Sequence, residues 1–306
     1  MITQLKRLAF ALLAVFCAVT VAAGQSRSLR VKIPFRVTPY NNIVIQAVLN
    51  DRDTVQLMLH TASSGVTLTE AALANLKTVK WDGSVDGVQS WGGGDNTSDF
   101  SKGNTIRIGT LRRTDITVWT DKNSGQESDG KFGLDLFENS VLEFDFDKNT
   151  LTVSSALPRK VKKYEKLRLE PADGDLFLPA VCQIGNDSFP QRFLIHSGYG
   201  GAVLLDDQFA NDTQIGQHIR ITGEKKLSDA YGNVLTTKKG LLPLFRIGNY
   251  ALRDAPVGFF EGKIGRQQLS VVGGDILKRF NWILDAQRHY VYLRPSRLFA
   301  AGYANL

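Results

Sequence analysis

The sequence predicts an all-β protein made of two similar lobes. From Leu29 onward, short apolar and β-branched segments alternate with turn residues. The apolar segment that ends at His60 has a counterpart that ends at His196, 136 residues later. Other landmarks recur in the same order at a spacing of 140 residues: Gly133 and Gly273, Asp135 and Asp275, Asp145 and Asp285. Unrelated β segments would not keep this register, so the sequence indicates an internal duplication and a pseudo-twofold arrangement.

Residues 1–24 are predicted to be a signal peptide. Lys6 and Arg7 form a basic start, Leu8–Val21 is almost wholly apolar, and Ala22–Gly24 offers small residues suited to signal-peptidase cleavage. The apolar run is shorter than the roughly 20 residues that a bilayer-spanning helix needs, so we expect no stable membrane anchor. We therefore expect an exported protein, either periplasmic or extracellular.

The rest of the chain carries a modest positive charge. Removal of residues 1–24 lowers the formal net charge from +7 to +5, and the excess is spread out apart from Arg159–Lys163 and Lys225–Lys226. Neither basic run is interleaved with aromatic residues, so we expect no nucleic-acid partner. Cys182 is the one cysteine left, which excludes an intrachain disulfide, and its apolar surroundings predict a buried thiol.

The N-terminal lobe is predicted to span residues 25–156. Asn42–Leu49 and Val55–Leu59 are rich in apolar and β-branched residues and are separated by turn residues, which predicts a hairpin. Its second strand leads into the first of the two histidines. A short helix is expected at Glu70–Leu76, with Thr69 as its cap.

The C-terminal lobe is predicted to span residues 165–306, after a basic linker at residues 157–164. Phe177–Ile184 corresponds to the first strand of the N-terminal hairpin, and Arg192–Ile195 to the strand that leads into the second histidine. Ala230–Asn233 has the composition of a hairpin tip. The chain thus repeats one order of elements on both sides of the linker.

Each lobe carries the same strand–turn motif. Leu57–Leu59 leads into His60-Thr61-Ala62, and Phe193–Ile195 leads into His196-Ser197-Gly198. A strand followed at once by a polar, a hydroxyl and a small residue places the polar side chain at a tight turn. Two copies can bring two such turns face to face.

This arrangement resembles the double-lobed, pepsin-like aspartic proteases, and more closely the bacterial proteins with two retropepsin-like lobes. The resemblance covers nearly the whole chain after the signal peptide and implies a bilobal pepsin-like fold of two β-barrels. It also implies that Thr61 and Ser197 are the hydroxyl residues that cross-link the two catalytic loops. Ala62 and Gly198 then occupy the small positions beside them.

Three further segments carry the resemblance. Phe132-Gly133 and Val272-Gly273 are similar to the apolar-Gly segments that cross beside the catalytic turns of the family. Val85–Phe100 resembles a flap hairpin, with its tip at Trp91, Gly92 and Gly93.

The family carries Asp at the two turn positions where this chain has His60 and His196. Aspartic proteolysis depends on two adjacent carboxylates that share one proton, one activating a water and the other donating to the scissile carbonyl. An imidazole presents one lone pair where a carboxylate presents several, and two imidazolium ions repel each other. We therefore expect standard aspartic-protease activity to be absent.

Three interpretations of the histidine pair remain. We favour a noncatalytic pseudoprotease that binds an extended peptide or protein between its lobes without cutting it. A rival is a noncanonical hydrolase or peptidase that uses the histidine pair or a bound metal. Zinc usually takes at least three protein ligands, and the repeat places no third histidine, so we assign no metal and no cofactor. The last interpretation is structural, with the histidines holding the lobes together. Both half-sites lie in one chain, so we expect a monomer.

Overall fold

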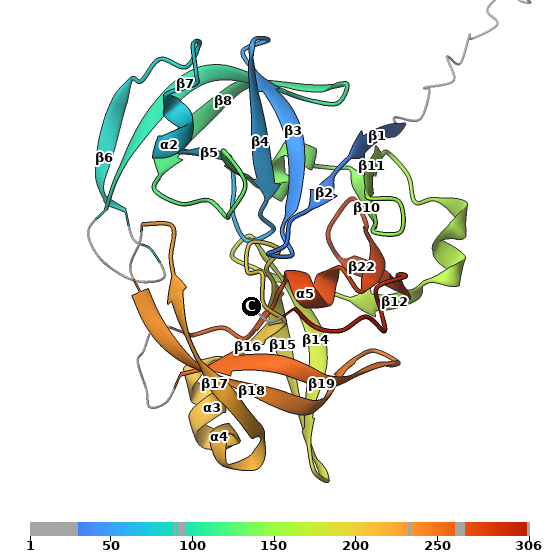
Figure 1. Cartoon of the computed structure of the whole chain (residues 1–306). Coiled ribbons are helices and arrows are strands. Elements are labelled where there is room, and N and C mark those ends of the chain that lie inside the picture. The colour runs from blue at the N-terminus through green and yellow to red at the C-terminus, as the bar shows by residue number, and fades with distance from the viewer. Residues whose placement is uncertain (1–29, 89, 91–95, 232–233, 261–266, 305–306) are drawn as a thin grey trace, which may run out of the picture.

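The computed structural model describes residues 30–88, 90, 96–231, 234–260 and 267–304. It confirms the predicted all-β, two-lobed fold (Figure 1). Each lobe contains a β-barrel, and a central six-stranded sheet joins the two lobes along one side. The segments predicted as a signal peptide and as the flap tip lie outside the described residues.

The N-terminal barrel contains eight strands in the order β2-β3-β4-β9-β5-β8-β7-β6. A further pairing of β3 with β7 closes six of them into a ring, which leaves β2 and β6 outside the closure. Closure removes free strand edges and encloses apolar side chains. The strands are β2 (Arg36–Val37), β3 (Ile43–Leu49), β4 (Asp53–Leu59), β5 (Val66–Thr69), β6 (Gly83–Val88), β7 (Asn96–Ile108), β8 (Leu111–Asp121) and β9 (Gly130–Phe132).

The C-terminal barrel repeats this topology, in the order β13-β14-β15-β20-β16-β19-β18-β17, and β14 pairs with β18 to close it. The parallel pairs match as well, since β4–β9 in the first lobe corresponds to β15–β20 in the second. The internal duplication is therefore present in the pairing pattern itself. The strands are β13 (Glu170–Ala172), β14 (Asp175–Ile184), β15 (Asp187–Ile195), β16 (Val203–Leu204), β17 (Arg220–Ser228), β18 (Val234–Ile247), β19 (Tyr250–Phe259) and β20 (Val271–Val272).

The central sheet combines strands from both halves of the chain in the order β1-β11-β10-β21-β22-β12. At its middle, β10 pairs with β21, and the rings of Phe144 and Trp282 stack with centroids 3.9 Å apart. Both rings are buried in the main core, so this sheet connects the two lobes through apolar packing as well as hydrogen bonds. Its strands are β1 (Arg30–Pro34), β10 (Val141–Asp145), β11 (Thr150–Ser154), β12 (Glu165–Arg168), β21 (Phe280–Leu284) and β22 (Tyr290–Pro295).

The described helices are short. The side chain of Thr69 accepts a hydrogen bond from the backbone N–H of Ala72, which caps the predicted first helix, but the helix ends at Leu73 and not at Leu76. Two helices in the second lobe were not expected, and His218, expected in a loop, ends one of them. The α-helices are α2 (Glu70–Leu73), α3 (Asp207–Asp212), α4 (Ile215–His218) and α5 (Gly274–Leu277), and the 3-10 helices are η1 (Leu134–Phe137) and η2 (Arg159–Lys163).

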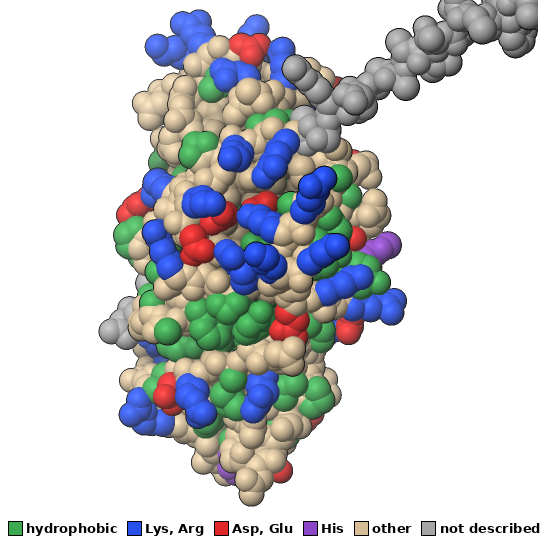
Figure 2. Space-filling model, turned by 90° about the vertical axis from the view of Figure 1, so that its right-hand side faces the viewer, with side chains coloured by type: hydrophobic (Ala, Val, Ile, Leu, Met, Phe, Trp, Pro, Cys, Tyr) green, Lys and Arg blue, Asp and Glu red, His purple; other side chains and the backbone are tan. Residues whose placement is uncertain are grey.

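The basic segment expected as a linker lies against the outer face of the central sheet. Residues 159–163 form η2, Lys160 pairs with the buried Glu143, and Val161 packs on a small apolar cluster that includes Tyr164 and Tyr292. Lys and Arg side chains gather over this side of the molecule (Figure 2).

The structure also bears on two further features, the Cys182 thiol and the length of the helices. Cys182 is buried, and burial raises the pKa of its thiol to about 12, so the side chain acts as a small apolar group and not as a nucleophile. Within the described ranges, the helices are all too short to cross a bilayer.

Candidate functional site

The two histidines follow equivalent strands and meet between the lobes. His60 follows β4, and its backbone N–H donates to the carbonyl of Phe132 at 2.9 Å; His196 follows β15 and donates to Val272 at 3.0 Å. The ring centroids lie 4.5 Å apart at an interplanar angle of 60°. The sequence repeat has therefore brought two imidazoles into direct contact.

A reciprocal set of hydrogen bonds locks the two turns together. The Thr61 hydroxyl donates to the carbonyl of Ile195 at 2.5 Å, and the Ser197 hydroxyl donates to that of Leu59 at 2.6 Å. Each hydroxyl also accepts the backbone N–H of the other residue at 3.0 Å. All four bonds are buried and all run between the lobes. Each hydroxyl thus satisfies one backbone N–H and one backbone carbonyl of the opposite lobe.

Comparison with known proteins agrees with this geometry. Residues 45–136, within the first lobe, match the aspartyl protease family. The fold is similar to that of the aspartic proteinase from Irpex lacteus, with a TM-score of 0.57 and 12% sequence identity over 89% of this chain and 99% of that one. The chain therefore has the fold of the pepsin-like aspartic proteinases, and its first lobe matches the aspartyl protease family. A search among curated proteins finds no match.

The electrostatics of this pepsin-like chain differ from those of a carboxylate pair. Burial, then the neighbouring His196 and then Lys131 lower the pKa of His60 well below its usual value of 6.5. Burial is also the main cause that lowers the pKa of His196 to about 4, with a further contribution from Lys131. Both rings are therefore neutral near neutral pH, and the position between the lobes carries no negative charge from the turns.

The two rings differ in their hydrogen bonds. His196 Nδ1 accepts the backbone N–H of Tyr199 at 2.9 Å, which leaves the proton of the neutral ring on Nε2. His60 Nδ1 is buried and has no hydrogen-bond partner among the described residues. One histidine is thus fixed in one tautomer by its own turn, and the other has a free nitrogen.

The small residues of the turns also differ. A Cβ at Gly198 would collide with the imidazole of His60, so glycine is required there for the ring to approach. Ala62 instead packs on an apolar cluster of the second lobe, beside Tyr199. Each turn is therefore in contact with the opposite lobe, but through different chemistry.

The apolar-Gly segments lie directly beside the turns. Gly133 contacts the backbone of Ser63 and Ser64, and a side chain at this position would overlap that backbone. Gly273 lies equally close to Tyr199 and to the carbonyl of Gly201. Phe132 and Val272, which precede the two glycines, are fully buried in the main core.

Each lobe extends a hairpin on the same side of the molecule (Figure 1). In the first lobe β6 pairs with β7 from Gly83 opposite Phe100 to Val88 opposite Asn96, where the sequence predicts a flap. The predicted tip residues Trp91, Gly92 and Gly93 lie outside the described residues. They remain a prediction.

The second hairpin, β17–β18, contacts the first lobe. The carbonyl of Ala230 accepts the backbone N–H groups of Lys122 and Asn123 at 3.1 and 2.8 Å. The hydroxyl of Ser90, in the first hairpin, donates to the Asp229 carboxylate at 2.5 Å. The two lobes therefore touch at the hairpins as well as at the turns.

Asn42 is a site residue that the sequence reasoning missed. Its side-chain amide donates to the carbonyls of Ser197 at 2.9 Å and Gly198 at 3.2 Å, and the amide of Asn41 donates to Gly200 at 2.7 Å. Both asparagines come from the first lobe and hold the turn of the second. An Asn pair before a strand looks like ordinary turn chemistry, so only the three-dimensional contact reveals this role.

A buried ion pair was also missed. Lys131, in the apolar-Gly segment, has its Nζ 2.8 Å from the carboxylate of Asp121, at the end of β8. The corresponding segment of the second lobe has Val271 at this place, so a comparison of the two repeats could have drawn attention to the lysine. Asp121 also accepts from the Ser124 hydroxyl at 2.6 Å.

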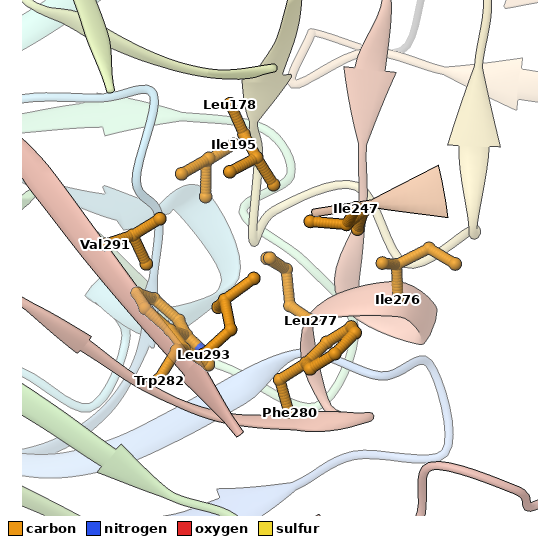
Figure 3. Close-up of a pocket in the computed structure, with 9 residues that line it drawn as sticks. All are labelled: Leu178, Ile195, Ile247, Ile276, Leu277, Phe280, Trp282, Val291 and Leu293. Carbon is orange, nitrogen blue, oxygen red and sulfur yellow. The ribbon is translucent and has the colours of Figure 1, made fainter. Parts of the chain in front are cut away.

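Two pockets of the described structure are lined by neither histidine. One, of about 160 Å³, is lined by residues near Arg30 and Glu143 on the central sheet. The other is an apolar cavity of about 10 Å³ inside the second lobe, too small for more than a water-sized probe (Figure 3). It is lined by Leu178, Ile195, Ile247, Ile276, Leu277, Phe280, Trp282, Val291 and Leu293. Neither contributes polar chemistry to the site.

Proposed function

We propose that this chain is a noncatalytic member of the pepsin-like proteins that binds an extended peptide or protein segment between its lobes. The observation that carries the proposal is the replacement of both family carboxylates by partly buried, neutral imidazoles, with the supporting framework of the turns intact. A chain that loses the two acids and keeps the cross-link retains the means to hold the lobes in their binding arrangement.

The chemistry of the pair argues against acid-type cleavage. Two neutral imidazoles supply neither the shared proton nor the several acceptor positions with which a carboxylate pair holds its water. The Nδ1 atom of His196 is already occupied by the N–H of Tyr199. What His196 offers to a ligand is therefore a single Nε2–H donor, which suits hydrogen bonding to a carbonyl better than activation of a water.

The frame around the pair supports ligand binding. Both lobes carry a hairpin on the same side of the molecule, and extended peptides commonly bind by adding main-chain hydrogen bonds to exposed strands. Such binding needs no catalytic group.

A second candidate function is a noncanonical hydrolase or peptidase that uses the histidine pair. It is favoured by the buried Nδ1 of His60, which has no partner among the described residues and lies beside a second imidazole. A neutral imidazole can act as a general base, although a pKa lowered by burial makes it a weak one. In the described part of the chain, no group of three or more His, Cys, Asp or Glu side chains is placed to hold a metal.

The two functions are separated by comparing three proteins on one peptide library. These are the wild type, the His60→Asp/His196→Asp variant, and a His60→Asn/His196→Asn control that cannot act as an acid or base. Cleavage is followed from pH 3 to pH 8, with and without a chelator, and binding is measured in parallel by fluorescence anisotropy.

We expect the wild type and the Asn control to bind peptides without cutting them, and the double-Asp variant to gain pepstatin-sensitive cleavage at acid pH. Cleavage by the wild type that is lost in the Asn control would establish the hydrolase instead. If chelator also stops that cleavage, the histidines hold a metal. Absence of any peptide binding by the wild type would overturn the proposed function.

We further propose that the mature protein is an exported monomer. The proposal rests on the composition of residues 1–24 and on the presence of both half-sites in one chain. N-terminal sequencing of the protein recovered from its native cell should begin close to residue 25, and light scattering should give a single-chain mass. An N-terminus at Met1 or a stable dimer would contradict it.

A further inference from the structure

The two sides of the histidine pair carry opposite chemistry at equivalent positions. In the first lobe, Lys131 lies opposite Met58 of β4 and Thr67 of β5. In the second lobe, Val271 lies opposite Leu194 of β15 and Leu204 of β16, the corresponding strands. Lys131 and Val271 are thus related by the internal duplication.

The first-lobe side presents an ammonium group. In the ion pair of Lys131 with Asp121, the side chain of the lysine is 16% exposed and that of the aspartate only 2%. The carboxylate is therefore shielded, while part of the lysine is accessible. A bound molecule that reaches this pair meets the cation first.

Asp121 is suited to fix the lysine and not to receive a ligand. One of its oxygens accepts from both Lys131 and Ser124. Its other oxygen, Oδ1, is buried without a hydrogen-bond partner among the described residues. The aspartate thus fixes the position of the lysine ammonium.

The second-lobe side is apolar and nearly closed to solvent, with Val271 only 5% exposed. Val271 belongs to a small cluster with Phe177, Leu194, Leu204 and Phe260, separate from the main core. Ala62, from the turn of the first lobe, packs against this cluster. Because Ala62 is two residues from His60, the apolar cluster lies immediately beside the histidine pair.

The two histidines belong to the turns beside Lys131 and Val271, and as neutral rings they add no negative charge to the site. Lys131 precedes Phe132, whose carbonyl accepts the backbone N–H of His60. The charge of the lysine also helps to lower the pKa of both imidazoles. Lys131 is therefore linked to the turn of His60 through the next residue of its own strand.

We propose that the site recognises a peptide by a carboxylate held at Lys131 and by a bulky apolar side chain held at the Val271 cluster. This inference rests on the proposed peptide-binding function and specifies its ligand. The carboxylate is either an Asp or Glu side chain or the C-terminus of the peptide. Charge-assisted hydrogen bonds of this kind are about twice as strong as neutral ones, which makes the carboxylate a source of specificity.

The test is a binding array of N-acetylated decapeptides on the wild-type protein. Each peptide contains one Leu or Phe, and each neighbouring position is varied in turn among Asp, Asn and Ala. Every peptide is made with an amidated and with a free C-terminus, so that the two sources of the carboxylate are separated. We expect at least one carboxylate-bearing peptide to bind about tenfold more tightly than its amide counterpart. This preference should weaken in high salt.

Variants then assign the preference to residues. Asp121→Asn/Lys131→Met removes both charges of the buried pair and should reduce the carboxylate preference to less than about twofold. Lys131→Arg should retain the preference, and so should Lys148→Met, a control at a lysine whose side chain is 75% exposed. Val271→Thr should weaken the preference for Leu and Phe over Ala and leave the carboxylate preference unchanged.

Binding that shows no carboxylate preference, or a preference that survives in the double variant, overturns this inference and leaves the proposed function standing. The comparison of carboxylate and amide peptides uses the wild type alone. It therefore tests the carboxylate preference even if the double variant does not fold. If the wild type binds no peptide at all, the proposed function and this inference are both wrong.

Discussion

The two lobes share their backbone pattern and their cross-link, yet they differ in the side chains that flank the histidine pair. Thr61 and Ser197 make the same pair of bonds in opposite directions. Lys131 and Val271 stand at equivalent pairings but belong to an ion pair and to an apolar cluster. The comparison teaches that the residues which hold the lobes together are alike in chemistry, while the residues at the equivalent flanking positions differ.

The largest expected effect comes from removing one member of the ion pair. Lys131→Met leaves the buried Asp121 carboxylate without its partner, and we expect a loss of about 3–5 kcal/mol in the free energy of unfolding. Replacing both residues, as in Asp121→Asn/Lys131→Met, should recover most of this loss. Urea unfolding of the four proteins of this double-mutant cycle measures the coupling. If Lys131→Met lowers the free energy of unfolding by less than about 1 kcal/mol, the ion pair is solvated. The difference in environment between Lys131 and Val271 would then be small.

The cross-link should respond equally on both sides. Thr61→Val leaves a buried backbone N–H of Ser197 and the carbonyl of Ile195 unpaired, and Ser197→Ala does the same to Thr61 and Leu59. We expect each variant to lose about 2–3 kcal/mol in unfolding free energy. Thr150→Val, at an exposed hydroxyl, is the matched control. Clearly different losses in unfolding free energy for Thr61→Val and Ser197→Ala would show that the two halves of the cross-link are not equivalent.

A third effect is a pH dependence of stability that reports the burial of the histidines. The pKa of His196 is lowered from 6.5 in the unfolded chain to about 4 in the folded one. Between these pH values the histidine is protonated in the unfolded state but not in the folded state. The free energy of unfolding is therefore highest above pH 6.5 and falls as the pH drops toward 4. The slope should be about 1.4 kcal/mol per pH unit.

The measurement compares wild type with His196→Asn, which can still accept the Tyr199 N–H but does not titrate. Urea midpoints at pH 7, 6, 5 and 4.5 should diverge as the pH falls, with the variant changing less. Parallel curves for the two proteins would mean that the ring is solvated. His60→Asn should act in the same direction, because the pKa of His60 is also lowered.

The architecture was predictable because local sequence patterns indicate the strands and because these patterns recur at a fixed spacing. Period-two apolar segments predict strands, and the fixed spacing from Gly133 to Gly273 and from Asp135 to Asp275 predicts two copies of one lobe. Helix α3 was missed although Asp206 offers a capping signal, since its side chain accepts from the N–H of Phe209. Its short apolar pattern gave too weak a helical period to identify it.

The site was only partly predictable for a different reason. The positions of His60 and His196 follow from the strand–turn motif, but the partners of these turns come from distant segments. Lys131 alternates with the buried Phe132 along its strand, and this alternation gives no sign of a partner for the lysine. In the fold that side chain reaches Asp121 at the end of β8, a strand that is separated from β9 in the sheet by β5.

The reciprocal cross-link has a consequence for how the two halves of the chain can change. A symmetric assembly of two separate chains with such a contact would dissociate on dilution and would have to present the same residues on both sides. Here the short segment of residues 157–164 keeps the halves at a high effective concentration, so the contact persists at any dilution. Each half is also encoded separately, and a substitution in one is not copied into the other. Covalent joining thus removes the requirement for identity and allows one side of the site to be cationic and the other apolar.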